Sequence, residues 1–140
     1  MIGEKMSIEK AIAEYGFVVH TFRGTSMLPM LRQGIDAVRL IAVREKLKKY
    51  DIPLYVRNDG ALVLHRIIRV KRDGYIIRGD NCLWNEEVKH EQIIAVAEGI
   101  YQNGKYKSGT CVRVKWYAIR QWLTLPWRRL RWYMNREKSY

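Results

Sequence analysis

Two side chains of this sequence, Ser26 and His65, could together carry out nucleophilic chemistry. A serine hydroxyl is a poor nucleophile until a neighbouring base removes its proton, and a neutral imidazole suits that task near pH 7. Ser26 lies in the segment GTSMLP, where Gly24 permits an unusual backbone angle and Pro29 stiffens the turn that follows. We therefore expect Ser26 at the tip of a turn. The alternative is that its hydroxyl only caps a short helix.

The candidate base lies in an apolar segment, residues 62–68 (LVLHRII), where the imidazole of His65 is the one uncharged polar side chain. The alternative for His65 is a hydrogen-bonded core histidine. A third segment, Gly79-Asp80-Asn81, reads as a turn and is followed by the acidic residues Glu86 and Glu87. A carboxylate near a histidine base can fix its tautomer and stabilise the imidazolium.

Taken in order, the three segments match a known pattern: Ser-Met-x-Pro at 26–29, His-Arg-Ile at 65–67 and Gly-Asp-Asn at 79–81. This sequence resembles the signal peptidase and LexA-type clan of serine peptidases. The likeness runs from about Arg23 to Ala97 and includes 50–55 (YDIPLY), which is similar to the Gly-Asp-Ile-Val strand of that clan. Most members of the clan use a lysine as the base. With His65 at that position, this sequence resembles the endoplasmic-reticulum type of signal peptidase.

The resemblance implies that Ser26 is the nucleophile, that His65 is the general base, and that no metal or cofactor is needed. It also implies an aspartate at or just after Gly-Asp-Asn as the partner of His65. Asp80 keeps the first of these positions, whereas the later one falls on Glu86, and we prefer Asp80 by a narrow margin. Gly24 stands where many signal peptidases have a hydroxyl residue. We therefore expect the backbone N–H of Ser26 and a second, unassigned donor to hold the oxyanion.

These expectations favour an endopeptidase that cleaves a peptide or preprotein of the leader or signal-peptide type. A second class is a regulator that cleaves itself, for which we expect the 25 residues before Ser26 to be too few to add a DNA-binding domain. A third class is a non-catalytic binding protein on the same fold, held on membrane or nucleic acid by its basic tail. The presence of a serine, a histidine and two candidate acids argues against that third class.

The elements that must position these residues are mostly strands. Ile8, Ala11, Ile12 and Tyr15 fall at helical spacing and predict a short helix over 7–15 that ends at Gly16. We expect strands over 17–22, 35–43, 52–56, 62–70, 75–78 and 93–101, which are rich in Val, Ile, Leu and Tyr. Hairpin turns are predicted at 58–60, 73–74 and 103–104. The predicted fold is mainly β: a single antiparallel domain of the signal peptidase/LexA-like type.

We divide the chain into an N-terminal helix and first strand (1–22), a catalytic β domain (23–110) and a basic aromatic helical segment (111–140). In the last segment apolar residues recur every three or four positions, and Pro126 predicts one amphipathic helix to about Leu123 and a second from near Thr124. The segment holds eight basic residues against one acidic residue, and thus +7 of the net charge of +12.

Residues 112–134 also carry four of the five tryptophans, at positions 116, 122, 127 and 132. Such a helix can lie at the surface of an anionic membrane, or its apolar stripe can pack on the β domain, and we rank the two equally. Nucleic acid ranks third. No run of residues reaches the length of a membrane span, and Cys82 and Cys111 are expected as reduced thiols. We therefore expect a cytoplasmic protein, peripheral at most on the inner face of the membrane.

Overall fold

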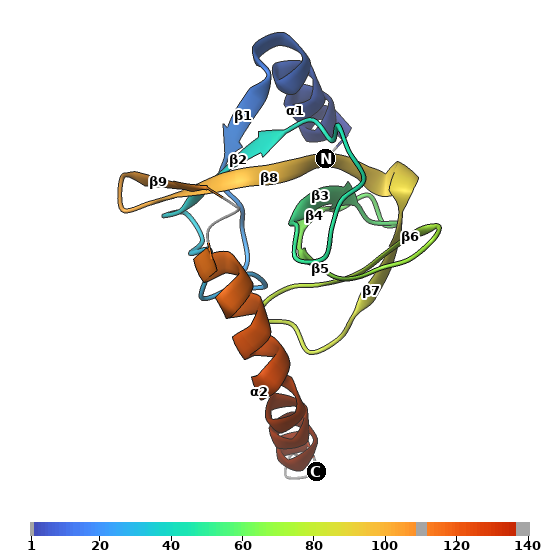
Figure 1. Ribbon diagram of the computed structural model, residues 1–140, viewed down its shortest axis with the longest axis vertical. Coiled ribbons are helices and arrows are strands. Elements are labelled where there is room, and N and C mark those ends of the chain that lie inside the picture. Colours follow the sequence, from blue (N-terminus) through green and yellow to red (C-terminus); the bar gives the residue numbers. More distant parts are fainter. Residues whose placement is uncertain (1, 109–111, 137–140) are drawn as a thin grey trace.

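Two antiparallel β-sheets form the body of the protein, and a helix flanks them at each end of the chain (Figure 1). The computed structural model describes residues 2–108 and 112–136. In chain order the elements are α1 (Ile2–Tyr15), β1 (Phe17–His20), β2 (Ala37–Ile41), β3 (Pro53–Val56), β4 (Leu62–Leu64), β5 (Arg66–Val70), β6 (Gly74–Arg78), β7 (Glu86–Lys89), a 3₁₀ turn (His90–Gln92), β8 (Ile93–Gln102), β9 (Lys105–Ser108) and α2 (Val112–Arg136). The mainly β fold with a short N-terminal helix is confirmed.

The larger sheet has the strand order β1-β2-β8-β3-β4, and β9 also pairs with β8. The smaller sheet has the order β5-β6-β7. Strand β3 is buried on both faces. Successive side chains of a strand point to opposite sides, so its residues enter two different apolar clusters. Leu54 joins the apolar cluster under α1, whereas Tyr55 joins a second cluster with Ile67 and Ile77 of the smaller sheet. The two sheets therefore share a continuous interior at β3.

Helix α1 forms because Ile8 and Ile12, one turn apart, bury their side chains against the larger sheet. The helix ends as predicted at Gly16, whose φ of +81° and N–H bond to the Ile12 carbonyl (2.8 Å) are typical of a helix C-cap. It begins at Ile2 and not at residue 7, so the predicted start was wrong. The first strand also ends at His20, two residues earlier than predicted.

The predicted hairpin turns are confirmed. Gly74 opens β6 directly after β5, and the turn at 58–60 joins the paired strands β3 and β4. Asn103 and Gly104 both have positive φ angles, 51° and 72°, which is the requirement of a two-residue type I′ turn. That turn sets the register in which Gln102 pairs with Lys105.

One predicted strand, 62–70, is two strands in the structure. β4 ends at Leu64 and pairs with β3 in the larger sheet, while β5 begins at Arg66 and pairs with β6 in the smaller sheet. His65 is the single residue between them. The apolar run looked continuous because both halves are buried, and burial alone does not mark the point where a chain passes from one sheet to another.

The predicted break near Pro126 was also wrong, because α2 is one helix from Val112 to Arg136 with Pro126 inside it. Proline removes one backbone hydrogen bond and crowds the preceding turn, which costs about 3 kcal/mol. Directly after the proline, Arg128 and Arg129 bond to backbone carbonyl groups of the loop at 80–83. These contacts hold the second half of the helix against the body and offset part of that cost.

Candidate active site

Ser26 lies in the loop between β1 and β2, which is anchored on both sides of the serine. Met27, Met30 and Leu31 are buried in the core, and the Leu31 N–H bonds to the Met27 carbonyl (2.9 Å). Gly24, at φ +95°, donates its N–H to the side-chain oxygen of Gln33 (2.8 Å). Ser26 itself is partly exposed in a series of turns, which agrees with the predicted position at the tip of a turn.

Ser26 and His65 are brought together around Gly79. A Cβ atom added at Gly79 would lie 2.7 Å from the Ser26 carbonyl oxygen and 2.9 Å from Nε2 of His65, so both atoms border this glycine. The N–H of Asn81 also donates to the Ser26 carbonyl (2.7 Å). Only glycine leaves room for this approach. Among the described residues, the hydrogen-bond partner of the imidazole is on Nδ1, and the Ser26 hydroxyl makes no bond to Nε2.

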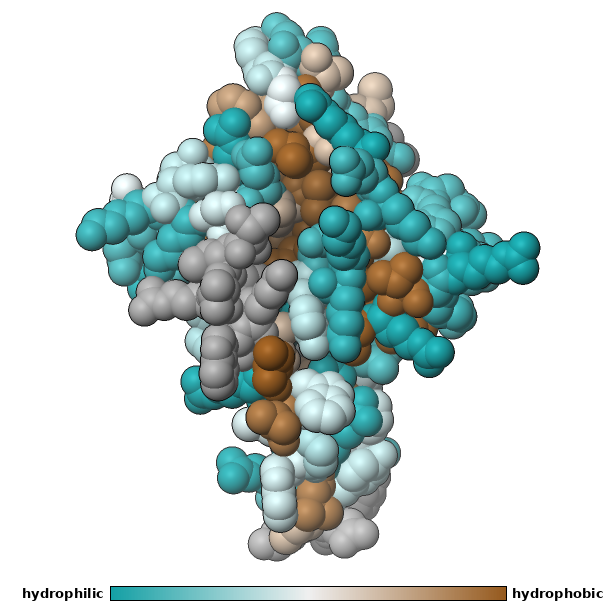
Figure 2. All heavy atoms as spheres, in the orientation of Figure 1, coloured by the Kyte–Doolittle hydropathy of each residue, from teal (hydrophilic) through white to brown (hydrophobic). Residues whose placement is uncertain are grey.

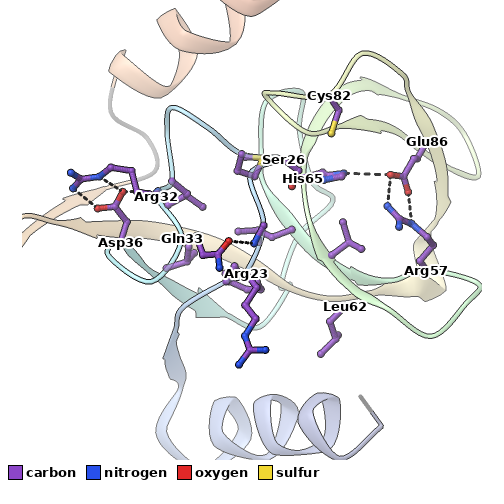
Figure 3. Close-up of a pocket in the computed structure, with 17 residues that line it drawn as sticks. Arg23, Ser26, Arg32, Gln33, Asp36, Arg57, Leu62, His65, Cys82 and Glu86 are labelled. Carbon is purple, nitrogen blue, oxygen red and sulfur yellow. Dashed lines mark hydrogen bonds and ion pairs between the residues drawn. The ribbon is translucent and has the colours of Figure 1, made fainter. Parts of the chain in front are cut away.

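The other ring nitrogen, Nδ1, lies beside the hydroxyl of Tyr55 and the carboxylate of Glu86. Figure 3 shows the contact between His65 and Glu86. The Tyr55 hydroxyl oxygen is 3.2 Å from Nδ1, and Oε1 of Glu86 is 3.6 Å from it. The Tyr55 hydroxyl donates its proton to Oε2 of Glu86 (3.0 Å), so its oxygen is left as an acceptor. Acceptors on this side favour the tautomer with the proton on Nδ1 and the lone pair on Nε2, the nitrogen nearer Ser26.

Glu86 is held in place by a two-pronged contact with Arg57, whose guanidinium donates to the carboxylate at 2.9 and 2.6 Å. Burial acts to raise the pKa of the Glu86 carboxyl, but the hydrogen bonds from Arg57 and Tyr55 outweigh it and hold this pKa below its ordinary value. Burial lowers the pKa of His65 from its ordinary 6.5, and the charge of Glu86 opposes that shift only in part. At pH 7 the pair is therefore a neutral imidazole beside an ionised carboxylate.

Asp80 has a different partner. Its carboxylate accepts two hydrogen bonds from the Arg66 guanidinium, both 2.7 Å long, and both side chains are buried. Arg66 also contacts the Tyr50 carbonyl (3.3 Å) and the Met30 sulfur (2.9 Å). The structure thus uses Asp80 to neutralise a buried arginine and places Glu86 beside His65. Between the two predicted acids, the geometry favours Glu86.

A cavity of about 310 Å³ opens beside Ser26 and His65. Its apolar lining comes from both the loop that carries Ser26 and the strands: Phe22, Met27, Leu31, Val38, Leu62, Val63 and Leu64. Polar and charged groups at its border include Arg23, Arg57 and Glu86. A small apolar side chain fits such a space, with polar groups left for the backbone of a bound peptide.

Tyr55 and Arg57 belong to the site but were not predicted as site residues from the sequence. They reach His65 because Tyr55 pairs with Val63 in the β3–β4 hairpin, two positions before the histidine. Cys82 also lines the cavity, and burial raises the pKa of its thiol, which keeps it protonated at neutral pH. The other cysteine, Cys111, lies outside the described residues.

Within residues 2–108 and 112–136, no cluster of three His, Cys, Asp or Glu side chains could hold a metal ion. In the same part of the chain no helix has the length and apolar character needed to cross a bilayer. The sequence matches no protein-family model and no curated protein.

Proposed function

We propose that the protein is a serine endopeptidase in which Ser26 attacks the substrate, His65 moves the proton and Glu86 orients His65. One observation carries this proposal. The two nitrogens of His65 lie beside different groups: Nε2 and the Ser26 carbonyl oxygen both border Gly79, whereas Nδ1 lies next to Tyr55 and Glu86. A core histidine needs only hydrogen-bond partners, whereas a nucleophile on one nitrogen and a carboxylate on the other form the arrangement of a catalytic triad.

The proposed reaction is acyl transfer. Oγ of Ser26 attacks the scissile carbonyl carbon while its proton passes to Nε2 of His65, and the carbonyl oxygen becomes an oxyanion. When the C–N bond breaks, the imidazolium gives this proton to the leaving amine, and the substrate acyl group stays on Ser26. Water then attacks the ester by the same route and releases the acid. The backbone N–H of Ser26 is the proposed donor to the oxyanion.

The three ordered motifs support a relationship between this protein and the signal peptidase and LexA-type clan. They also support the fold of that clan for this chain. His65 in place of lysine supports a likeness to the endoplasmic-reticulum type. The substrate proposed on this basis is a peptide or preprotein with a leader or signal segment. The apolar cavity beside Ser26 supports a small apolar side chain next to the scissile bond.

The test is cleavage of a mixed peptide library, read by mass spectrometry, with wild-type protein and four variants. Ser26→Ala and His65→Gln should each lower turnover by about 10⁴-fold or more, and the double variant should be no worse than either one, because the two residues act as a unit. Thr25→Ala removes the exposed hydroxyl next to Ser26 and is the matched control with wild-type turnover. Near wild-type cleavage by Ser26→Ala would overturn the proposal.

A further inference from the structure

Helix α2 contacts the β body through one face. Arg128 donates to the Asn81 carbonyl and to its side-chain oxygen, both at 2.9 Å, and Arg129 donates to the Leu83 carbonyl at 2.7 Å. Trp132 on the same side meets Trp84 edge to face, with ring centroids 5.9 Å apart. Ala118 and Leu125 are the buried apolar residues of this face. The helix is thus attached mainly by arginines bonded to backbone oxygens.

The apolar residues of α2 lie mostly on the opposite face. At 100° per residue, the exposed apolar side chains occupy an arc of about 140° around the helix axis. Arg128 and Arg129, which bond to the body, lie outside this arc. Seven large apolar side chains form this exposed stripe: Ile119, Trp122, Leu123, Trp127, Leu130, Tyr133 and Met134. Each is between 42% and 74% exposed, and Trp127 is the most exposed. Tyr133, at the edge of the stripe nearer the body, also meets the ring of Trp84. Figure 2 shows brown apolar side chains along the lower part of the molecule, where Figure 1 places α2.

Charge indicates what covers the exposed stripe. Residues 119–136 contain five arginines and no acidic residue. Arg120 and Arg131 are exposed and lie on the helix surface at one border of the stripe. A second copy of this helix would bring arginines against arginines with no acid to offset them. A surface that binds nucleic acid carries cations along its centre to contact the phosphates. The centre of the exposed stripe is instead formed by Leu123 and Leu130.

We propose that the exposed stripe of α2 docks in the surface of an anionic lipid bilayer, with the helix parallel to the membrane plane. Leucine, methionine and tryptophan side chains enter the boundary between headgroups and acyl chains, and the bordering arginines attract lipid phosphates. The opposite face keeps its bonds to the loop at 80–83. Because the Asn81 N–H holds the Ser26 carbonyl, the docked helix lies one loop away from the proposed nucleophile.

Flotation with vesicles tests this proposal on the full chain carrying Ser26→Ala, so that the result does not depend on peptidase activity. The vesicles are phosphatidylcholine alone or phosphatidylcholine with an equal part of phosphatidylglycerol. We expect binding to the anionic vesicles, weak binding to the neutral ones, and weaker binding at high salt, because screening reduces the arginine contribution. Arg120→Gln and Arg131→Gln should each weaken binding to anionic vesicles about fivefold.

The apolar contribution is tested with Leu123→Gln and Leu130→Gln, which keep a residue of high helix propensity at exposed positions. Each should weaken binding about tenfold. Ile35→Gln is the matched control, because Ile35 is an apolar residue of the β body that is at least as exposed as the two leucines, and it should bind as the parent does. Circular dichroism should show the same helix content in all variants.

Three results would overturn the proposal: full-length protein that ignores anionic vesicles, binding that is equal for Leu130→Gln and the parent, or a dimer in buffer that Leu123→Gln converts to a monomer. The last result would assign the exposed stripe to a second copy of this chain. If the second result is found while Arg120→Gln and Arg131→Gln still weaken binding, it would indicate nonspecific charge attraction in place of docking of the stripe.

Discussion

Nδ1 of His65 lies 3.6 Å from Oε1 of Glu86, and the Tyr55 hydroxyl bridges the two groups. Glu86 is the first residue of β7, 21 positions after the histidine and in the smaller sheet. Tyr55 belongs to the larger sheet. The proposed base is therefore oriented by one residue from each sheet, and the roles of Glu86 and Asp80 can be separated by experiment.

Glu86→Gln and Asp80→Asn should damage different properties. Glu86→Gln removes the charge that stabilises the imidazolium and should lower kcat about 10²- to 10⁴-fold while the melting temperature changes little, since the pair with Arg57 is partly exposed. Asp80→Asn leaves the buried Arg66 charge uncompensated and should cost about 3–5 kcal/mol of unfolding free energy. Kinetics and thermal unfolding of both variants check this. The reverse pattern would assign the orienting role to Asp80.

The pH dependence of kcat/KM should show a single rising limb below pH 6.5. His65 must be neutral to accept a proton, and burial lowers its pKa from the ordinary 6.5. Activity is therefore lost as pH falls through this lowered pKa and is constant above pH 7. Glu86→Gln removes an influence that raises this pKa, so residual activity of the variant should have its limb at still lower pH. A limb above pH 7 in the wild-type protein would contradict the buried, neutral histidine.

Gly79→Ala should disrupt the site directly. The added methyl group would lie 2.7 Å from the Ser26 carbonyl oxygen, a backbone atom that cannot move without the nucleophile loop. We expect a loss of kcat of about 10²-fold, because a misplacement of reacting groups by about 1 Å can cost that much in rate. Gly3→Ala is the control, because a Cβ at Gly3 meets nothing within 4 Å and alanine favours the helix it lies in. Equal activity of the two variants would show that the loop tolerates displacement.

Arg128→Gln should loosen the loop that contacts Ser26. The guanidinium bonds both oxygens of Asn81, and the Asn81 N–H in turn holds the Ser26 carbonyl. Faster amide hydrogen exchange is expected in peptides covering 79–84, with unchanged exchange in β2 and β8. Arg131→Gln, an exposed arginine of the same helix, should leave loop exchange as in the wild type. If both variants exchange alike, Arg128 does not stabilise this loop.

Local patterns predicted much of this molecule. The hairpin turns followed from pairs such as Asn103-Gly104, whose residue types match the positive φ angles of the turn. The pairing of Ser26 with His65 was expected only from the family resemblance that the ordered motifs carry, and the structure brings both residues to one cavity. Turn chemistry and residue type are local properties, so a single sequence displays them.

The remaining features depend on pairing between distant segments. Nothing in the run 62–70 marks His65 as the point where the chain changes sheets. The partner of Asp80 could not be predicted because arginine is rarely buried, and Arg66 is fully buried. Without that pair, Asp80 and Glu86 look equivalent as partners of His65. The path of α2 through Pro126 depends likewise on tertiary contacts of Arg128 and Arg129.

The chain passes from one sheet to the other at His65, so the proposed catalytic groups come together only when both sheets have formed. Ser26 comes from a loop of the larger sheet, Glu86 lies in the smaller sheet, Gly79 follows directly after its strand β6, and His65 joins the two sheets. A folding intermediate with only one sheet formed would hold an incomplete set of reacting groups. We expect the proposed peptidase activity to arise only at the final cooperative step of folding, so that a newly made chain cannot cut itself or its neighbours while its own peptide bonds are still exposed.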